Sequence, residues 1–250
     1  MEIARFALDV VLGFLFGALG GLFGIGGGLI AIPMLAVLYG LDQQHAQGTA
    51  MVMVAPNVLI GLYQYRKRSG LDMRLAVPLA VSGIAFMYLG ARIATAVPST
   101  PLRIAFATFQ VALFASTLIP RKRDLGERPT ARRPWPAVIP IGVVGGAVSG
   151  IFGVGGAIFA VPLFTWFFAM TQAAAQGLGL AMVAPGTIVT ITEYALAHDV
   201  VWTVGIPLAI GGIFSVPAGV AAAHRLPDRV LRLLFGVVLL GSAVALYLRA

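Results

Sequence analysis

The two halves of this chain carry near-copies of one hydrophobic sequence, separated by a constant 129 residues. Residues 23–33 read FGIGGGLIAIP and residues 152–162 read FGVGGAIFAVP. At the same offset and without a gap, residues 47–57 (QGTAMVMVAPN) match residues 176–186 (QGLGLAMVAPG). A duplicated sequence predicts two structural units with the same architecture. The hydrophobic surfaces of the two units are expected to pack against each other.

Composition places both copies in a membrane. The chain is 59% hydrophobic and only 10% charged, with a mean hydropathy of +0.95. A soluble domain carries about 25% charged residues, and could not cover this much apolar surface. The chain has no cysteine, so disulfides and cysteine-ligated metal centres are excluded. In so apolar a chain, an internal duplication is typical of a secondary transporter, whose site lies between the repeats.

Each copy contains five hydrophobic segments, and a helix needs about 20 apolar residues to cross a bilayer. The second segment of each copy is too short to cross unless it is tilted or incomplete. We therefore predict an all-α polytopic membrane protein with two homologous repeats, residues 1–119 and 136–250, and broken or re-entrant helices at the repeat interface. A polar, proline-rich linker, residues 120–135, joins the repeats. The segments are 4–22, 27–40, 46–65, 74–95 and 101–119, then 136–151, 156–170, 175–197, 202–223 and 229–248.

Charge predicts the orientation. Residues 66–74 and 121–133 hold +7 of the net charge of +8. We interpret this as membrane topology rather than nucleic-acid binding, because Lys and Arg beside hydrophobic segments mark the cytoplasmic side. The counterpart of the first basic loop, around residues 195–203, has no Lys or Arg and contains Asp199. Equivalent loops of opposite charge favour inverted repeats in the cell inner membrane, with a cytoplasmic linker.

Two glycine runs interrupt the hydrophobic sequence at equivalent positions. A glycine loop that opens a helix presents its N–H groups together with the positive end of the helix dipole, which favours an anion. Close packing between membrane helices is the alternative role for such glycines. The candidate anion-binding residues in these runs are Gly26, Gly27, Gly28, Gly155 and Gly156.

A matched pair of prolines, Pro56 and Pro185, lies midway along the third segment of each repeat. Proline removes one helical hydrogen bond and clashes with the preceding turn. We expect a helix break at each, with freed backbone groups facing a central site; a simple kink is the alternative. Asn57, directly after the first proline, adds a candidate side-chain donor.

Gln47 and Gln176 lie at equivalent positions ten residues before Asn57 and its counterpart. A glutamine inside a hydrophobic segment either bonds a neighbouring helix or binds a polar substrate, and both readings stay open. Tyr65 and Tyr194 also match across the repeats, which makes gating a secondary hypothesis for them.

Charged residues inside hydrophobic segments are functional candidates by default. Glu193 is a candidate acceptor for a coupling proton, with an interfacial position as its alternative. Arg103 and Arg232, which follow proline at segment starts, are interpreted as interfacial anchors. The histidines are scattered without ligand spacing, so we predict no metal site and no cofactor.

These glycine and QG…AP motifs resemble the TauE/SafE sulfite exporter family of membrane permeases, and the resemblance covers nearly the whole chain. It implies transport of sulfur-containing anions such as sulfite or organosulfonates. Family members are described as eight-segment proteins of two four-segment repeats. This chain has ten hydrophobic segments, and the two counts agree if the short segments are re-entrant.

The leading hypothesis is a permease for a small anion that works by alternating access, with the lipid bilayer as its other partner. A homo-oligomer is compatible with the sequence. The alternatives are a permease for another small organic anion or organosulfur compound, and a non-transporting membrane scaffold. An intramembrane hydrolase would have to use Ser149 with His198 or His224, and we predict no enzyme.

Overall fold

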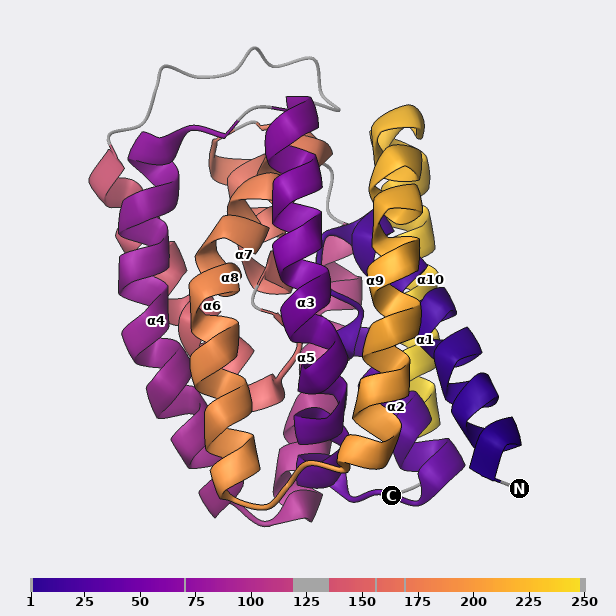
Figure 1. Cartoon of the computed structure of the whole chain (residues 1–250). Coiled ribbons are helices and arrows are strands. Elements are labelled where there is room, and N and C mark those ends of the chain that lie inside the picture. Colours follow the sequence, from indigo (N-terminus) through magenta and orange to yellow (C-terminus); the bar gives the residue numbers. More distant parts are fainter. Residues whose placement is uncertain (1, 70, 119–134, 156, 169, 248–250) are drawn as a thin grey trace.

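The computed structural model describes residues 2–69, 71–118, 135–155, 157–168 and 170–247. These residues form ten α-helices and one short 3-10 helix, η1 (Trp135–Val138), which confirms the all-α prediction (Figure 1). The predicted linker, apart from Trp135, lies outside the described residues, as does Gly156. The helices are α1 (Glu2–Phe23), α2 (Gly28–Tyr39), α3 (Gln43–Ser69), α4 (Met73–Ala96), α5 (Ser99–Thr117), α6 (Ile139–Phe152), α7 (Ala157–Phe167), α8 (Gln172–Leu196), α9 (Trp202–Arg225) and α10 (Asp228–Tyr247).

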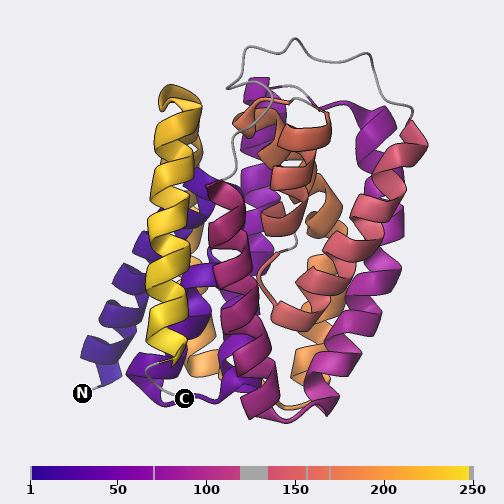
Figure 2. The same ribbon diagram turned by 180° about the vertical axis from the view of Figure 1, so that it is seen from behind.

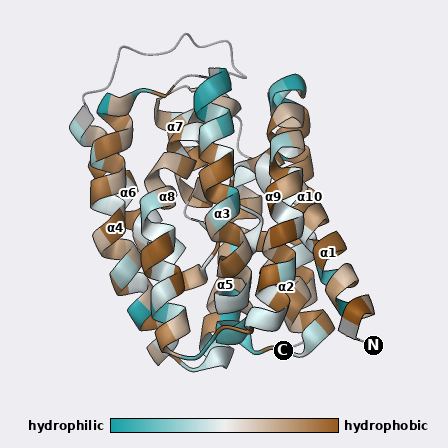
Figure 3. Ribbon diagram, in the orientation of Figure 1, coloured by the Kyte–Doolittle hydropathy of each residue, from teal (hydrophilic) through white to brown (hydrophobic). Residues whose placement is uncertain are grey.

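Six of these helices are long and apolar enough to cross a bilayer: α1, α3, α4, α8, α9 and α10. Hydrophobic side chains cover their outer faces, and hydrophilic residues gather at the two ends of the bundle (Figure 3). The short helices α2 and α7 are largely buried among them. This arrangement is that of a multi-pass membrane protein, as the composition predicted.

The helices of the two halves keep the spacing of the sequence. The helices α2, α3, α4 and α5 each begin 129 residues before α7, α8, α9 and α10. In Figure 1, α3 ends and α4 begins at the upper end of the bundle, whereas α8 ends and α9 begins at the lower end. Equivalent helices therefore run in opposite directions along the bundle.

Each half packs its first helix against the fourth helix of the other half, so α1 lies along α9 and α6 lies along α4 (Figure 2). Glycine permits the close approach: a Cβ atom on Gly150 would lie 2.1 Å from the carbonyl oxygen of Met87, and one on Gly211 would lie 2.0 Å from that of Val10. Small residues at such contacts let membrane helices associate through their backbones. The two halves are therefore interleaved rather than side by side.

The expected helix breaks at Pro56 and Pro185 are wrong. Both α3 and α8 continue through their prolines as single helices, and the Pro185 ring is exposed on the outer face. A proline removes only one hydrogen bond, and more than two turns on each side hold the helix together. The chain instead leaves helical geometry at the glycine runs, between α1 and α2 and between α6 and α7.

Candidate functional site

Both glycine runs adopt backbone conformations that favour glycine. Gly24, Gly26 and Gly27 have φ angles of 66°, 73° and 96°, and Gly153 and Gly155 have φ angles of 64° and 65°. A side chain is strained in this left-handed region, because its Cβ atom crowds the backbone. These glycines end α1 and α6 inside the protein. The hydrophobic sequence around them would otherwise allow each helix to continue.

The two glycine loops touch each other at the centre of the bundle. A Cβ atom on Gly28 would lie 3.0 Å from the carbonyl oxygen of Gly153, and a Cβ atom on Gly155 would lie 3.1 Å from that of Ile25. All four residues are buried. The loops from the two halves therefore form one continuous backbone surface.

Two helix N-termini converge at this contact. The helix α2 begins at Gly28 and α7 begins at Ala157, and the two helices run from there toward opposite ends of the bundle (Figure 1). Gly27, the N-cap residue of α2, offers no side chain to bond the first-turn amides. The first amides of a helix lack intrahelical acceptors, and each helix start carries a partial positive charge. Of these amides, Ile30 already bonds the carbonyl of Gly27 and Ile158 that of Gly155. The convergence of two such ends favours a negative charge between them.

A Tyr–Gln pair caps the broken end of α1. The Tyr65 hydroxyl lies 2.6 Å from Oε1 of Gln176 and 3.0 Å from the carbonyl oxygen of Gly21. The Gln176 side-chain amide donates to the carbonyl of Leu22 at 3.3 Å. The last carbonyls of a helix have no intrahelical partner, and in a membrane they must be satisfied within the protein. Gln176 and Tyr65 meet this need for α1.

The equivalent pair at the end of α6, Tyr194 and Gln47, contains one donor without a partner among the described residues. The Tyr194 hydroxyl donates to Oε1 of Gln47 at 2.8 Å and lies 3.5 Å from the carbonyl oxygen of Ile151. Gln47 is fully buried against Gly153, and its Nε2 atom has no hydrogen-bond partner within the described part of the chain. An unmet buried donor costs about 1–3 kcal/mol, so this amide is suited to a ligand acceptor.

Asn57 connects the first glycine loop to α9. Its Nδ2 atom donates to the carbonyl of Gly26 at 3.1 Å, and its amide group packs against Gly212, where a Cβ atom would come within 2.6 Å. The Oδ1 atom of Asn57 finds no partner among the described residues. The side chain thus positions the loop and keeps one polar atom free.

The structure brings most of the predicted site residues together. Gly26, Gly27, Gly28, Gly155, Gln47, Asn57 and Gln176 all lie in or against the two glycine loops. Glu193 lies apart from them, near the end of α8, where its carboxylate is 3.7 Å from the exposed guanidinium of Arg92. The direct bonding of Tyr65 and Tyr194 to the two glutamines was missed, although their equivalent positions in the repeat were a signal.

A titratable cluster lies at the end of the bundle opposite the basic loops. The His45 ring lies 3.0 Å from Asp42 and 3.8 Å from Asp199. Burial raises the pKa of the Asp199 carboxyl, and His45 opposes that rise. Among the described residues, no group of three His, Asp or Glu side chains is arranged to hold a metal ion.

The comparisons with known proteins agree with this architecture. A family model described as sulfite exporter TauE/SafE matches residues 10–246. The chain belongs to the TauE/SafE sulfite exporter family. A probable membrane transporter protein of Xylella fastidiosa strain Temecula1 is 29% identical over 226 residues, which is 87% of this chain and 85% of the relative. One of Methanocaldococcus jannaschii is 25% identical, covering 92% of this chain and 91% of the relative.

This TauE/SafE protein is therefore a membrane transporter, and the resemblance seen in the glycine motifs is confirmed. No solved structure matches the chain. Ser149 Oγ, the nucleophile of the hydrolase alternative, makes no hydrogen bond to any described residue.

Proposed function

We propose that this TauE/SafE transporter moves a small sulfur-containing anion, such as sulfite or an organosulfonate, by alternating access between two inverted repeats. The observation that carries the proposal is the convergence of the α2 and α7 N-termini at the contact between the two glycine loops. Without an anion, two positive helix ends face each other in a low-dielectric interior, which is unfavourable.

The anion would accept hydrogen bonds from the backbone N–H groups at Gly26–Gly28 and at Gly155 and Gly156. The unpaired amide of Gln47 would add a side-chain donor, and Asn57 would hold the first loop in place. Sulfite and sulfonate groups present three oxygens, so they can accept from several donors at once. A site made of neutral dipoles, without a fixed cation, binds an anion and still releases it.

Three observations support inverted repeats. Equivalent helices start at a constant offset of 129 residues. The α3–α4 and α8–α9 loops lie at opposite ends of the bundle. The helix α1 packs against α9, and its equivalent α6 packs against α4. Because the loop at residues 66–74 is basic, we assign its end of the bundle to the cytoplasm. Transport would then consist of one repeat rocking against the other around the central loops.

The test is sulfite flux into proteoliposomes of the purified protein, with and without a proton gradient, and with organosulfonates as competitors. We expect saturable flux that Gln47→Glu abolishes, because a carboxylate there repels the anion. The matched control is Gln64→Glu, on the same helix but outside the site. Saturable uptake of a sulfonate without sulfite flux would support the anion permease and change the substrate. The absence of saturable flux for every anion tested would overturn the proposal in favour of a scaffold.

A further inference from the structure

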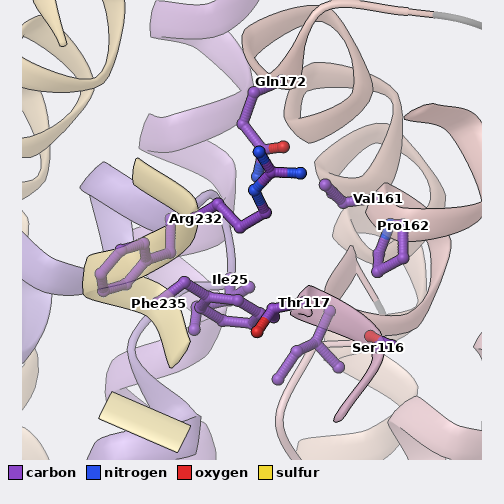
Figure 4. Close-up of a pocket in the computed structure, with 10 residues that line it drawn as sticks. Ile25, Ser116, Thr117, Val161, Pro162, Gln172, Arg232 and Phe235 are labelled. Carbon is purple, nitrogen blue, oxygen red and sulfur yellow. The ribbon is translucent and has the colours of Figure 1, made fainter. Parts of the chain in front are cut away.

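A small cavity lies near the basic end of the bundle, between α5, α7, α8 and α10 (Figure 4). Its volume is about 10 Å³, which is room for about one water molecule. Thr117, Gln172, Arg232 and Phe235 line it together with Ile25 of the first glycine loop. One residue of the central loops therefore shares the cavity with residues near the basic end.

Arg232 and Gln172 place side chains of the kind that bind anions beside this cavity, which an anion larger than water would have to widen. The two side chains extend into the same space from α10 and α8 (Figure 4). A guanidinium presents a planar set of donors that matches the oxygens of a carboxylate, sulfonate or phosphate, and it keeps its charge at every physiological pH. Ile25 and Phe235 give the same cavity an apolar wall, and a lower local dielectric strengthens such an interaction.

The same pair of residue types occurs at the opposite end of the bundle, 129 residues earlier. Arg103 on α5 and Gln43 on α3 are the equivalents of Arg232 and Gln172. Gln43 is 2% exposed, and both polar atoms of its side chain lack partners within the described ranges, as does Nε of Arg103. Unsatisfied polar atoms at such depth are costly unless a ligand meets them in another state.

Aromatic packing differs between the two ends. The Phe152 ring lies 5.4 Å from that of Phe106 and 5.0 Å from that of Phe109, measured between ring centroids. At the cavity end, the equivalent ring of Phe23 meets Phe235 at 5.3 Å. There the counterpart of Phe109 is the smaller Val238, which cannot stack on the ring.

At a second pair of equivalent positions, the Arg103 end again has the larger apolar side chain. The counterpart of the half-buried Thr117 is Leu246, which is 1% exposed. The Arg103 end is thus filled by larger apolar side chains at two equivalent positions.

We propose that Arg232 and Gln172 form the cytoplasmic binding vestibule for the transported anion, and that Arg103 and Gln43 form its counterpart on the opposite side, held closed here by Phe109. This inference rests on the proposed anion transport. It assigns the two arginines a role in ligand binding instead of the interfacial anchoring expected from the sequence.

The experiment uses the absence of native cysteine. A Thr117→Cys variant in proteoliposomes is labelled with the anionic sulfonatoethyl methanethiosulfonate and, separately, with its cationic trimethylammonium analogue. We expect the anionic reagent to react faster, and Arg232→Gln to lower its relative rate on the order of tenfold, as the loss of one nearby charge predicts. Arg229→Gln, an exposed arginine one turn earlier on α10, is the control, and Arg232→Lys should restore the preference.

The closed end is tested in the same way. Leu246→Cys should be unreactive in the parent protein and become reactive when combined with Phe109→Val, which reproduces the residue found at the open end. Equal rates for the two reagents at Thr117→Cys, or a preference that Arg232→Gln leaves unchanged, would overturn the vestibule. Labelling of Leu246→Cys without Phe109→Val would overturn the closure.

Labelling needs no transport, so the two proposals fail separately. A charge preference without sulfite flux would keep the vestibule and reject sulfite as the substrate. Saturable sulfite flux without a charge preference would keep the proposed function and reject the vestibule.

Discussion

The hydroxyl of Tyr65 lies 2.6 Å from the side-chain carbonyl oxygen of Gln176, 111 residues away in the other half of the chain. The same hydroxyl lies 3.0 Å from the carbonyl oxygen of Gly21, where α1 nears its end. One side chain therefore joins α3, α8 and the interrupted α1. The equivalent bond from Tyr194 to Gln47 joins α8, α3 and the end of α6.

Tyr65→Phe should destabilise the protein by about 1–2 kcal/mol, because it leaves two buried carbonyl groups without this donor. Thermal unfolding of the purified protein in detergent would measure the change. Tyr63→Phe is the matched control, since that ring lies two residues earlier and is 64% exposed. Equal unfolding temperatures for the two variants would show that the hydroxyl of Tyr65 contributes nothing to stability.

Gly28→Ala should reduce anion flux by about tenfold, because small displacements of binding groups have large effects on rate. Its Cβ atom would lie 3.0 Å from the carbonyl oxygen of Gly153 and 3.0 Å from Cγ2 of Val54, so the two loops must separate. Overpacking of this kind also costs about 1–3 kcal/mol of stability. Gly241→Ala is the control, because a Cβ atom there meets no atom within 4 Å. Normal flux in Gly28→Ala would remove the contact between the loops from the mechanism.

Asp199→Asn should raise the unfolding temperature at neutral pH. Burial raises the pKa of Asp199 above its ordinary value of 3.8, so the folded protein holds the charged form at a cost. That cost grows as pH rises from 3.8 through the raised pKa, and asparagine removes it. His45, 3.8 Å away, lowers the pKa of Asp199 and so opposes the effect of burial. The gain should therefore be larger at pH 8 than near pH 4, which unfolding scans at the two pH values would measure. A variant that is less stable than the parent at pH 8 would contradict this account.

Glu193→Gln should leave sulfite flux, and any response of that flux to a proton gradient, nearly unchanged. The carboxylate forms an ion pair with Arg92, whose side chain is 63% exposed, and such pairs contribute about 0–1 kcal/mol. This pair explains a charged residue at the end of α8 without a role in transport. Retained downhill flux with loss of the gradient response would instead identify Glu193 as the proton-coupling group.

The ten helical segments, the membrane environment and the family all followed from the sequence. Hydrophobic runs and their lengths are local properties, and the glycine motifs FGIGGG and FGVGGA are contiguous. The sequence predicted helix interruptions at the glycine runs and at the two prolines, and only those at the glycine runs occur. Glycine at positive φ ends α1 and α6, whereas the helices continue through Pro56 and Pro185 because neighbouring turns compensate for one lost hydrogen bond.

The tertiary structure alone decided which polar groups meet. Equivalent positions in the repeat indicated that Gln47 and Gln176 have similar surroundings, but not that Gln176 is fully bonded while Nε2 of Gln47 is unpaired in the described part of the chain. Nor did the sequence show that Arg232 lines a cavity while Nε of Arg103 has no hydrogen-bond partner in the described part of the chain. These differences depend on contacts between residues more than a hundred positions apart. Such contacts are set by how side chains of unequal size fill the space between helices, which no local pattern encodes.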